Sequence, residues 1–329
     1  MNKFTYSTAI LDAYNFLLKN YPEVFVIGQG LWSPWYVGNT MKDLDKKFGK
    51  KRIIDTPVSE AAVTGAAVGA SLNEMKPIVV HPRMDFMMYA MDPIINQAAK
   101  WSYMFGGQSS PSITIRGIIN RGGEQGAQHS QALHSWFAHI PGLKVVLPSS
   151  VADARDLLIA SVLAEQPVIY IDDRWLYDQE DILPEAKEIN LESISPFILR
   201  EGNSITLVGC GYSTLLLKKV TKKLIENEIN PEIIDMRIIN PFNSQLITNS
   251  VKKTGRLFVL DGGWGPCGIS SEIISSAVEN VEPKFFKSRP ARLTLPFVPA
   301  PTSKFLEEEY YPTEKKILNN IFKIFGNNL

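Results

Sequence analysis

Hydrophobic residues along the first half of the chain follow two alternating patterns. Helical periodicity covers residues 5–20, 91–104 and 150–165, and short apolar runs of strand length recur at 24–28, 76–80, 112–116, 143–148 and 167–171. Buried parallel strands are typically continuous apolar runs, and helices cover both faces of such sheets. The pattern predicts an α/β fold with a mostly parallel sheet, and it places Ser150 at the cap of the last of these helices.

The second half of the chain repeats this order after a break. Residues 181–200 are charged, proline-bearing and weakly periodic, which is typical of a linker with one or two edge strands. Strands are predicted at 204–209, 231–236 and 256–261, and helices at 213–227, 268–280 and 314–325. We therefore predict two doubly wound domains, over residues 1–180 and 201–329. The proline-rich stretch 283–312 is expected to wrap over a surface as an extended arm.

Composition narrows the classes of function. The 329 residues, 45% of them hydrophobic, suffice for one large or two medium globular domains. Thirty-four basic and thirty-four acidic residues cancel, so no net field steers nucleic acid or an acidic membrane surface to the protein. No apolar run approaches the roughly 18 residues of a membrane span. Cys210 and Cys267 are too few for a disulfide framework, so a reducing, cytoplasmic setting is expected.

One carboxylate stands at the start of a small, apolar run. Glu60 directly precedes AAVTGAAVGA, and a carboxylate that enters such a helix loses water, which disfavours its charged form. A carboxyl group that keeps its proton for this reason can act as a proton donor. The alternative is an ordinary helix N-terminal residue, stabilised by the helix dipole and capped by Ser59 or Thr56.

Three of the four histidines cluster in one segment. His129 lies on a glycine-bearing loop after the strand predicted at 112–116, and loops at the carboxyl ends of parallel strands commonly carry site residues. A purely structural role stays open for it. His134 and His139 are predicted to be a helix residue and a helix-end residue. The spacing of five residues places successive histidines about 140° apart on a helix, which does not suit a shared metal ion.

Two other motifs favour different chemistries. The turn GCGYST at 209–214, followed by Asp235, is similar to a nicotinamide-binding fingerprint, but Thr214 occupies the third glycine position, and any doubly wound domain needs a tight turn there. A Ser-His-Asp hydrolase would use Ser130 or Ser135. Neither serine lies in a GxSxG nucleophile elbow, which weakens that interpretation.

Four segments together resemble the β subunit of thiamine-diphosphate-dependent 2-oxo acid dehydrogenases, a family that includes the pyruvate, branched-chain and acetoin enzymes. They are DTPVSEAAVTGAAVGA (55–70), HPRMDFMMYAMDPIINQAAKWSYMFGGQ (81–108), GAQHSQALHSWFAHIPGLKVVLPSS (126–150) and DMRIINPFN (235–243). The resemblance covers nearly the whole chain in the family's order. It implies a pyrimidine-binding domain up to residue 180 and a transketolase C-terminal-like domain from residue 201.

The resemblance also implies roles for individual residues. Glu60 matches the glutamate that hydrogen-bonds N1′ of the cofactor's aminopyrimidine, and Phe86 matches the aromatic residue that stacks on this ring. Tyr89, one turn later, is expected to line the pocket, with ordinary core packing as the alternative for both aromatic residues. His129 matches the histidine that transfers protons near the reacting carbon. The implied reaction is decarboxylation of a 2-oxo acid and acyl transfer.

One family element is missing from this chain. It has no GlyAspGly followed 25 to 30 residues later by Asn, the element by which thiamine enzymes hold the diphosphate through a divalent metal. The resemblance therefore implies no metal site here, an E1 α subunit that holds the diphosphate and Mg²⁺, and an α2β2 heterotetramer, with a lipoyl-bearing E2 component in a full complex. The segments at 32–39 and 261–268 are candidate contact surfaces.

Three departures limit what the resemblance implies. Gln29 and Gly30 stand where relatives carry an acidic pair, Asp172 and Asp173 end a strand that usually ends in Glu, and Ala164 replaces an acidic residue near the potassium site of some relatives. The role of position 29, potassium binding and the identity of the 2-oxo acid stay open. Two alternatives also remain: a two-subunit thiamine enzyme that makes or breaks carbon–carbon bonds, for example in a sugar pathway, and a catalytically silent interaction subunit.

Overall fold

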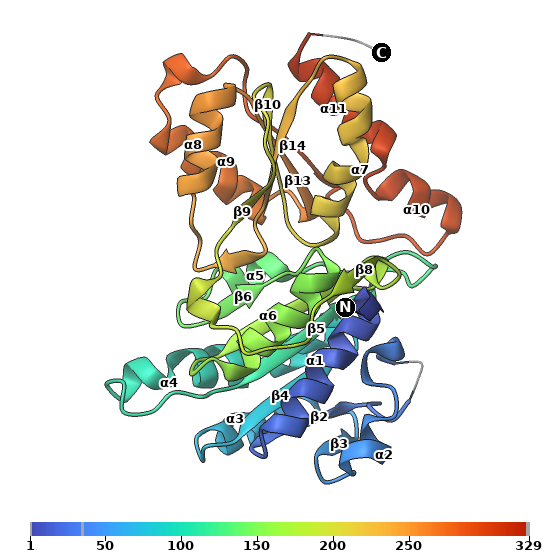
Figure 1. Cartoon of the computed structure of the whole chain (residues 1–329), viewed down its shortest axis with the longest axis vertical. Helices are drawn as coiled ribbons and strands as arrows, with labels where there is room; N and C mark the ends of the chain where they lie inside the picture. The colour runs from blue at the N-terminus through green and yellow to red at the C-terminus, as the bar shows by residue number, and fades with distance from the viewer. Residues whose placement is uncertain (1, 34–35, 327–329) are drawn as a thin grey trace.

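A seven-stranded sheet carries the first half of the chain in the computed structural model, which describes residues 2–33 and 36–326 (Figure 1). Its strands, in spatial order, are β12 (Ile238–Asn240), β6 (Lys144–Val146), β7 (Val168–Asp173), β5 (Thr114–Ile119), β4 (Lys76–His81), β2 (Val24–Gln29) and β3 (Ile53–Thr56). All neighbours are parallel except β12, which runs antiparallel to β6. The second half of the chain thus returns one strand to the first sheet.

A five-stranded sheet forms the second layer of strands. Its order is β14 (Ala291–Leu295), β13 (Leu257–Trp264), β10 (Ile205–Gly209), β11 (Pro231–Asp235) and β9 (Phe197–Arg200), with only β9 antiparallel. A separate antiparallel pair joins β1 (Asn2–Thr5) to β8 (Glu180–Leu183). Both large sheets are therefore mostly parallel, as the sequence predicts.

Helices cover both faces of each sheet. Around the first sheet they are α1 (Tyr6–Asn20), η1 (Gly38–Met41), α2 (Leu44–Phe48), α3 (Glu60–Ser71), η2 (Met84–Ala90), the π-helical η3 (Asp92–Ala98), α4 (Ala99–Met104), α5 (His134–Ala138), α6 (Val151–Leu163), η4 (Arg174–Leu176) and η5 (Leu191–Ser193). Around the second they are α7 (Tyr212–Glu226), α8 (Gln245–Thr254), α9 (Ile269–Asn280), η6 (Pro283–Phe285), α10 (Lys304–Tyr310) and α11 (Glu314–Ile324). None of the helices in the described ranges combines the length and apolar character that crossing a membrane requires.

Strand alternation divides the core. On β4, Ile78 and Val80 join the hydrophobic cluster under α1 and α6, while Val79 joins a second cluster on the opposite face, because successive strand side chains point to opposite sides. That second cluster also includes Val208 and Ile247 from the other half of the chain. The two sheets are thus packed together through a shared apolar layer, which fixes the carboxyl ends of the first sheet against the second half.

Several sequence expectations need correction. Residues 283–312 are not simply an extended arm: β14 joins the second sheet as an edge strand and α10 is helical. Pro290 and Pro296 flank this strand, and prolines so close together make a strand difficult to recognise in the sequence. Proline is nevertheless tolerated at strand ends. Residues 91–104 are helical as predicted, but they begin with a π-helical turn. The predicted cap of α6 is confirmed, since the Ser150 side chain accepts from the Asp153 amide at 3.1 Å.

Candidate active site

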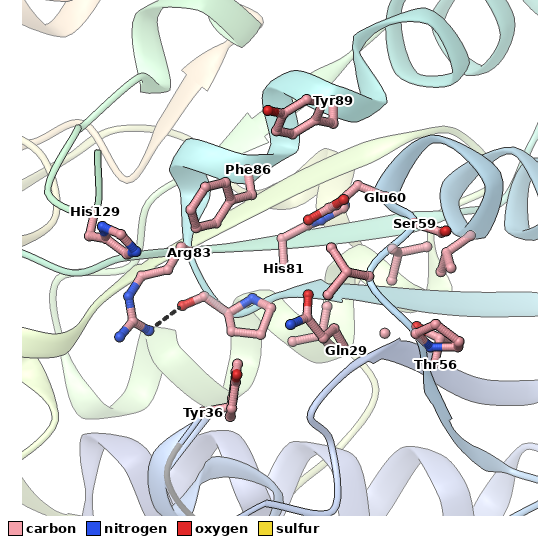
Figure 2. Close-up of a pocket in the computed structure, with 17 residues that line it drawn as sticks. Gln29, Tyr36, Thr56, Ser59, Glu60, His81, Arg83, Phe86, Tyr89 and His129 are labelled. Atoms are coloured by element: carbon pink, nitrogen blue, oxygen red, sulfur yellow. Dashed lines mark hydrogen bonds between the residues drawn. The ribbon is translucent and has the colours of Figure 1, made fainter. Parts of the chain in front are cut away.

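A cavity of about 550 Å³ opens at the carboxyl ends of β2, β3 and β4 (Figure 2). Ligands of open α/β sheets bind at this edge, because loops and helix N-termini converge there. The lining residues come from strand ends, the start of α3, η2 and the loop before α5: Gly28, Gln29, Tyr36, residues 56–60, Val63, residues 79–83, Phe86, Tyr89 and His129. All four predicted site residues are therefore in one cavity.

Glu60 is the first residue of α3 and lines the cavity half-buried. Within the described part of the chain its carboxylate has no hydrogen-bond or ion-pair partner. Ser59 occupies the N-cap position but forms no side-chain capping bond, and the Thr56 hydroxyl is buried without a partner. The positive end of the helix favours the carboxylate. Glu60 is thus held in place by its backbone, with its hydrogen-bonding capacity free for a ligand.

Two rings form the opposite wall. The Phe86 ring meets the His129 ring edge to face, with centroids 5.3 Å apart and planes at 82°. Tyr89 lies one turn after Phe86 on η2 and is 71% exposed at the edge of the cavity. Neither aromatic residue belongs to a hydrophobic core cluster, so ordinary core packing does not describe either of them.

Asp85 ties the His129 loop to η2. Its Oδ1 accepts hydrogen bonds from the backbone and side-chain nitrogens of Gln131, both at 3.0 Å, while its Oδ2 is buried without a partner. Burial raises the pKa of the Asp85 carboxyl, and the bonds from Gln131 oppose this shift. Since Asp85 is adjacent to Phe86 and Gln131 is close to His129, this contact fixes the two rings relative to each other.

The C-terminal part of the chain holds the other end of the same loop. The Glu124 amide donates to Glu307 Oε1 at 2.9 Å, and the Gly122 amide donates to the Tyr311 hydroxyl at 3.2 Å. Gly122 has φ +70°, and a Cβ there would lie 2.6 Å from the Trp175 ring, so only glycine fits this turn. The loop that carries His129 is therefore anchored from both sides.

His81 is a cavity residue that sequence reasoning missed. It ends β4, is 4% exposed, and its Nε2 lies 3.4 Å from the Thr64 hydroxyl. Burial lowers its pKa to about 4, so the imidazole is neutral near pH 7 and adds a polar group to the wall without adding charge. The sequence did contain a signal for His81, because a polar residue at the carboxyl end of an apolar parallel strand is in the usual place for a site residue.

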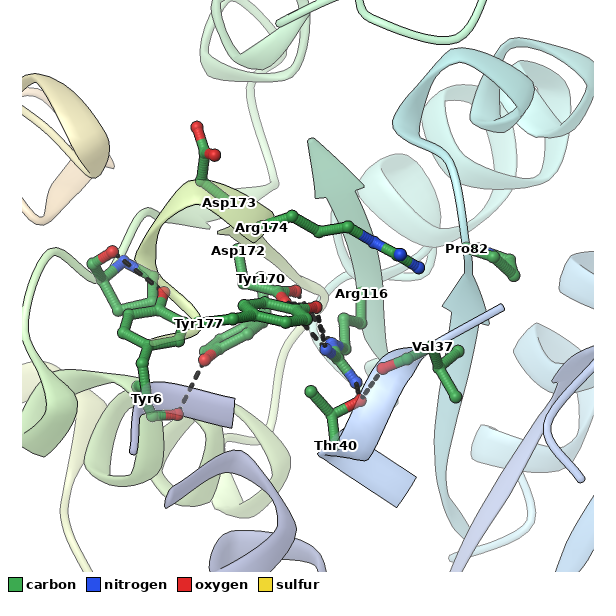
Figure 3. A network of polar contacts seen from close by, with 12 residues as sticks. Tyr6, Val37, Thr40, Pro82, Arg116, Tyr170, Asp172, Asp173, Arg174 and Tyr177 are labelled. Carbon is green, nitrogen blue, oxygen red and sulfur yellow. Dashed lines mark hydrogen bonds and ion pairs between the residues drawn. The ribbon is translucent and has the colours of Figure 1, made fainter. Parts of the chain in front are cut away.

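The two aspartates that depart from the family pattern belong to buried ion pairs, and Figure 3 shows the pair that Asp172 forms with Arg116. Asp172 receives two hydrogen bonds from Arg116, at 2.8 and 2.7 Å, and both side chains are fully buried. Asp173 pairs with Arg121 at 2.8 Å. Arg116 also donates to the Thr40 hydroxyl at 3.0 Å, which fastens the segment after β2 to the sheet.

The residues behind the competing interpretations are structural. Asp235 is fully buried, accepts from Ser149 and from Thr214, and is not accessible to a nucleotide ribose; burial raises its pKa to about 7. His134 is buried and pairs with Asp261 at 3.1 Å. Ranges 2–33 and 36–326 contain no cluster of three or more His, Cys, Asp or Glu side chains placed to hold a metal ion.

The candidate contact segments are partly exposed. Trp32 and Tyr36 expose 41% and 45% of their surface, and Cys267 is exposed in the turn before α9. Pro34 and Trp35 of the same predicted surface lie outside the described residues.

Comparison with known proteins defines the class to which this site belongs. The model of the transketolase pyrimidine-binding domain matches residues 2–179, and that of the transketolase C-terminal domain matches residues 197–317. A split-gene transketolase, described as an inactive β4 tetramer, has the same fold, with a TM-score of 0.78, 18% identity and 98% of each chain covered. The protein thus has the two-domain α/β fold of transketolase.

Relatives at higher identity narrow the class. The acetoin:2,6-dichlorophenolindophenol oxidoreductase β subunit of Bacillus subtilis is 33% identical over 97% of this chain and 96% of its own. The pyruvate dehydrogenase E1 β subunit of Rickettsia bellii is 35% identical over 98% of both chains, and the mitochondrial E1 β subunit of Bos taurus is 33% identical over 93% of this chain and 82% of its own. The chain belongs to the transketolase-like family of β subunits of thiamine-diphosphate-dependent 2-oxo acid dehydrogenases.

Proposed function

We propose that this chain binds the aminopyrimidine half of thiamine diphosphate and acts, with a separate α subunit, in the decarboxylation of a 2-oxo acid. The observation that carries the proposal is the Glu60 carboxyl, which has no partner among the described residues and lines the same cavity as the Phe86 and His129 rings. Glu60 is half-buried, so water can reach its carboxyl in the open cavity. A ligand that covers this carboxyl removes it from water and is favoured only if the ligand supplies a hydrogen bond in return.

The residues present fit the cofactor. An aminopyrimidine has a ring nitrogen for a carboxyl group and a flat face for an aromatic side chain, and Glu60 and Phe86 offer these two contacts in one cavity. Thiamine diphosphate, when bound, supplies the electron sink for loss of carbon dioxide. Glu60 holds or shares a proton at N1′ of the pyrimidine. Phe86 orients the ring, and Tyr89 covers the edge of the cavity.

His129 is assigned a separate task. Its loop is fixed by Asp85 and Gln131, so the imidazole stays beside Phe86, where it can give or accept a proton at an oxygen of the substrate. Neutral His81 keeps this wall polar without competing for the proton. These assignments agree with the roles that the family resemblance implies.

A partner completes the proposed site. Because the chain has no GlyAspGly…Asn element, an E1 α subunit is proposed to hold the diphosphate and Mg²⁺, in an α2β2 heterotetramer. The relatives are themselves named as β subunits. A lipoyl-bearing E2 component in the cytoplasm is the proposed acceptor of the acyl group.

Substitution of Glu60 tests the proposal. The chain is co-expressed with a candidate E1 α subunit from the same genome, and 2-oxo acid decarboxylation is measured with a dye acceptor at saturating thiamine diphosphate and Mg²⁺. We expect Glu60→Gln to lose at least about 100-fold in kcat, because a positioned proton-transfer group contributes roughly 10²- to 10⁴-fold. Glu74→Gln, an exposed glutamate beyond the other end of α3, is the matched control.

Two outcomes would reject the assignment. Retained activity in Glu60→Gln would show that this carboxyl does not activate the pyrimidine. No calorimetric signal for thiamine diphosphate with the assembled wild-type complex would favour the silent interaction subunit.

A further inference from the structure

Arg83 lines the cavity on the side of His129, and a second arginine, Arg174, contacts Tyr36, another lining residue. Arg83 follows β4 by two residues and lines the cavity, and Figure 2 shows its guanidinium on the same side as His129. Arg174 begins η4, directly after β7, and donates through Nη2 to the Tyr36 carbonyl. Figure 3 shows its side chain extending toward Pro82, the neighbour of Arg83 in sequence. Burial lowers the pKa of Arg83, and repulsion from the nearby charge of Arg174 lowers it further, so the two cations are neighbours beside one end of the cavity.

Neither guanidinium is neutralised within the described residues. Arg83 donates only to uncharged acceptors, the Pro82 carbonyl at 3.0 Å and the Gln125 amide oxygen at 3.3 Å. The Nε atoms of Arg83 and Arg174 are buried without partners. Asp85 attracts Arg83 electrostatically but makes no hydrogen bond with it.

The contrast with two nearby arginines is informative. Arg116, on β5, and Arg121, two residues after β5, are each paired with an aspartate at the end of β7. A fully buried arginine needs such a partner, because an uncompensated charge loses hydration without an equivalent gain.

Half-buried arginines elsewhere in the described chain, such as Arg52 and Arg256, donate to backbone carbonyls alone, but each of these is a single cation. Arg83 and Arg174 differ because two like charges are neighbours beside a cavity. Arg83 and Arg174 are thus a site prepared for an anion.

We propose that Arg83 and Arg174 bind an anionic oxygen group that the substrate retains through the reaction, either a second carboxylate or a phosphate. The guanidinium fork matches the two oxygens of either group. The alternative ligand is the carboxylate that leaves as carbon dioxide. This group loses its negative charge during the reaction, so two cations bound to it would stabilise the ground state more than the transition state and would slow the reaction. This inference rests on the proposed function for the identity of the reaction, but the anion site itself does not depend on it.

Direct binding tests the site without any thiamine chemistry. Inorganic phosphate and malonate are titrated into the full chain by calorimetry at low ionic strength, where screening is weak. We expect saturable binding by the wild type and a roughly 10- to 150-fold weaker Kd in Arg83→Met and in Arg174→Met, the range for loss of a charged hydrogen bond. The matched control is Arg289→Met, which removes an exposed arginine just before β14. Absence of binding by the wild type, or equal weakening in the control, would overturn the proposal.

Substrate preference distinguishes the two kinds of anion. The complex with the α subunit is assayed with three 2-oxo acids of equal chain length: 2-oxopentanoate, 2-oxoglutarate and 2-oxo-4-phosphonobutanoate. We expect 2-oxoglutarate, 2-oxo-4-phosphonobutanoate or both to have a higher kcat/KM than 2-oxopentanoate, because their KM is lower. Arg83→Met is expected to erase this preference. Equal kcat/KM for all three, or the same loss for all three in the variant, would contradict the inference.

Failure of the proposed function gives a different pattern. A complex that decarboxylates none of the three acids, while the chain still binds phosphate through Arg83 and Arg174, would refute the 2-oxo acid reaction and retain the anion site. Thermal unfolding of each variant confirms that it is folded.

Discussion

The buried pair between Arg116 and Asp172 allows a quantitative test of what holds the cavity together. Both side chains are fully buried and joined by two hydrogen bonds, and Arg116 also donates to Thr40 and to the Tyr177 hydroxyl at 3.1 Å. Three variants form a double-mutant cycle: Arg116→Met, Asp172→Leu and the double substitution. Each single change leaves one charge buried without its partner, whereas the double change leaves two apolar side chains of similar size.

The expected magnitudes follow from this geometry. Removing one partner of a buried pair costs about 3 to 5 kcal/mol, because the remaining charge stays desolvated. The double variant is expected to lose at least about 2 kcal/mol less than the sum of the single variants, since no charge remains to be compensated. Urea unfolding of the purified chain, followed by fluorescence and circular dichroism, gives these free energies. Single costs below about 1 kcal/mol, or strictly additive costs, would refute the argument.

Two further predictions concern a close contact and a buried carboxyl. A Cβ on Gly28 would lie 2.3 Å from the Val80 carbonyl oxygen, so Gly28→Ala is expected to lower stability by about 1 to 3 kcal/mol and weaken thiamine diphosphate binding, as measured by thermal unfolding and cofactor titration. Gly69→Ala, which meets nothing within 4 Å, is its control, and equal behaviour of the two would contradict the steric argument. The raised pKa of Asp235, about 7, means that the folded state binds this proton more tightly than the unfolded state, so the wild type loses stability as pH rises from about 4 to about 7. Asp235→Asn has no titrating carboxyl at this position. Its free energy of unfolding relative to the wild type should therefore rise by up to about 4 kcal/mol between about pH 4 and about pH 7. Parallel pH profiles of the two proteins in urea unfolding would show that Asp235 does not cause the pH dependence.

The regular elements could be predicted because each has a local signal. The apolar runs at 24–28 and 76–80 correspond to β2 and β4, and Ser150 marks the start of α6. The predicted strand at 112–116 is displaced, since β5 extends to Ile119. The charge of Arg116 and the following Gly117 interrupt the apolar run in the middle of β5, so the predicted strand ends at Arg116. In the structure Asp172 on the neighbouring strand supplies the countercharge that lets the strand continue. The partner lies 56 residues further along the chain, so the pattern around Arg116 alone could not reveal it.

The site was predictable only in part for the same reason. Glu60, Phe86 and His129 were found because they lie in segments with a family pattern, and the structure brings all three to one cavity. Arg83 was not recognised, because its significance depends on what is absent around it. Nothing in the sequence distinguishes an arginine beside Pro82, and only the fold shows that no carboxylate of the described residues pairs with it.

The anchoring of the His129 loop has a consequence for biosynthesis. Gly122 and Glu124 are bound by residues 189 and 183 positions further along the chain. At a synthesis rate of roughly 5 to 20 residues per second, the loop waits on the order of 10 to 40 seconds on the ribosome before its anchors exist. The first sheet can form during that time, but the cavity edge that carries His129 is finished only when Glu307 and Tyr311 have been synthesised. The α subunit of the proposed heterotetramer therefore meets a finished cavity only on a completed chain.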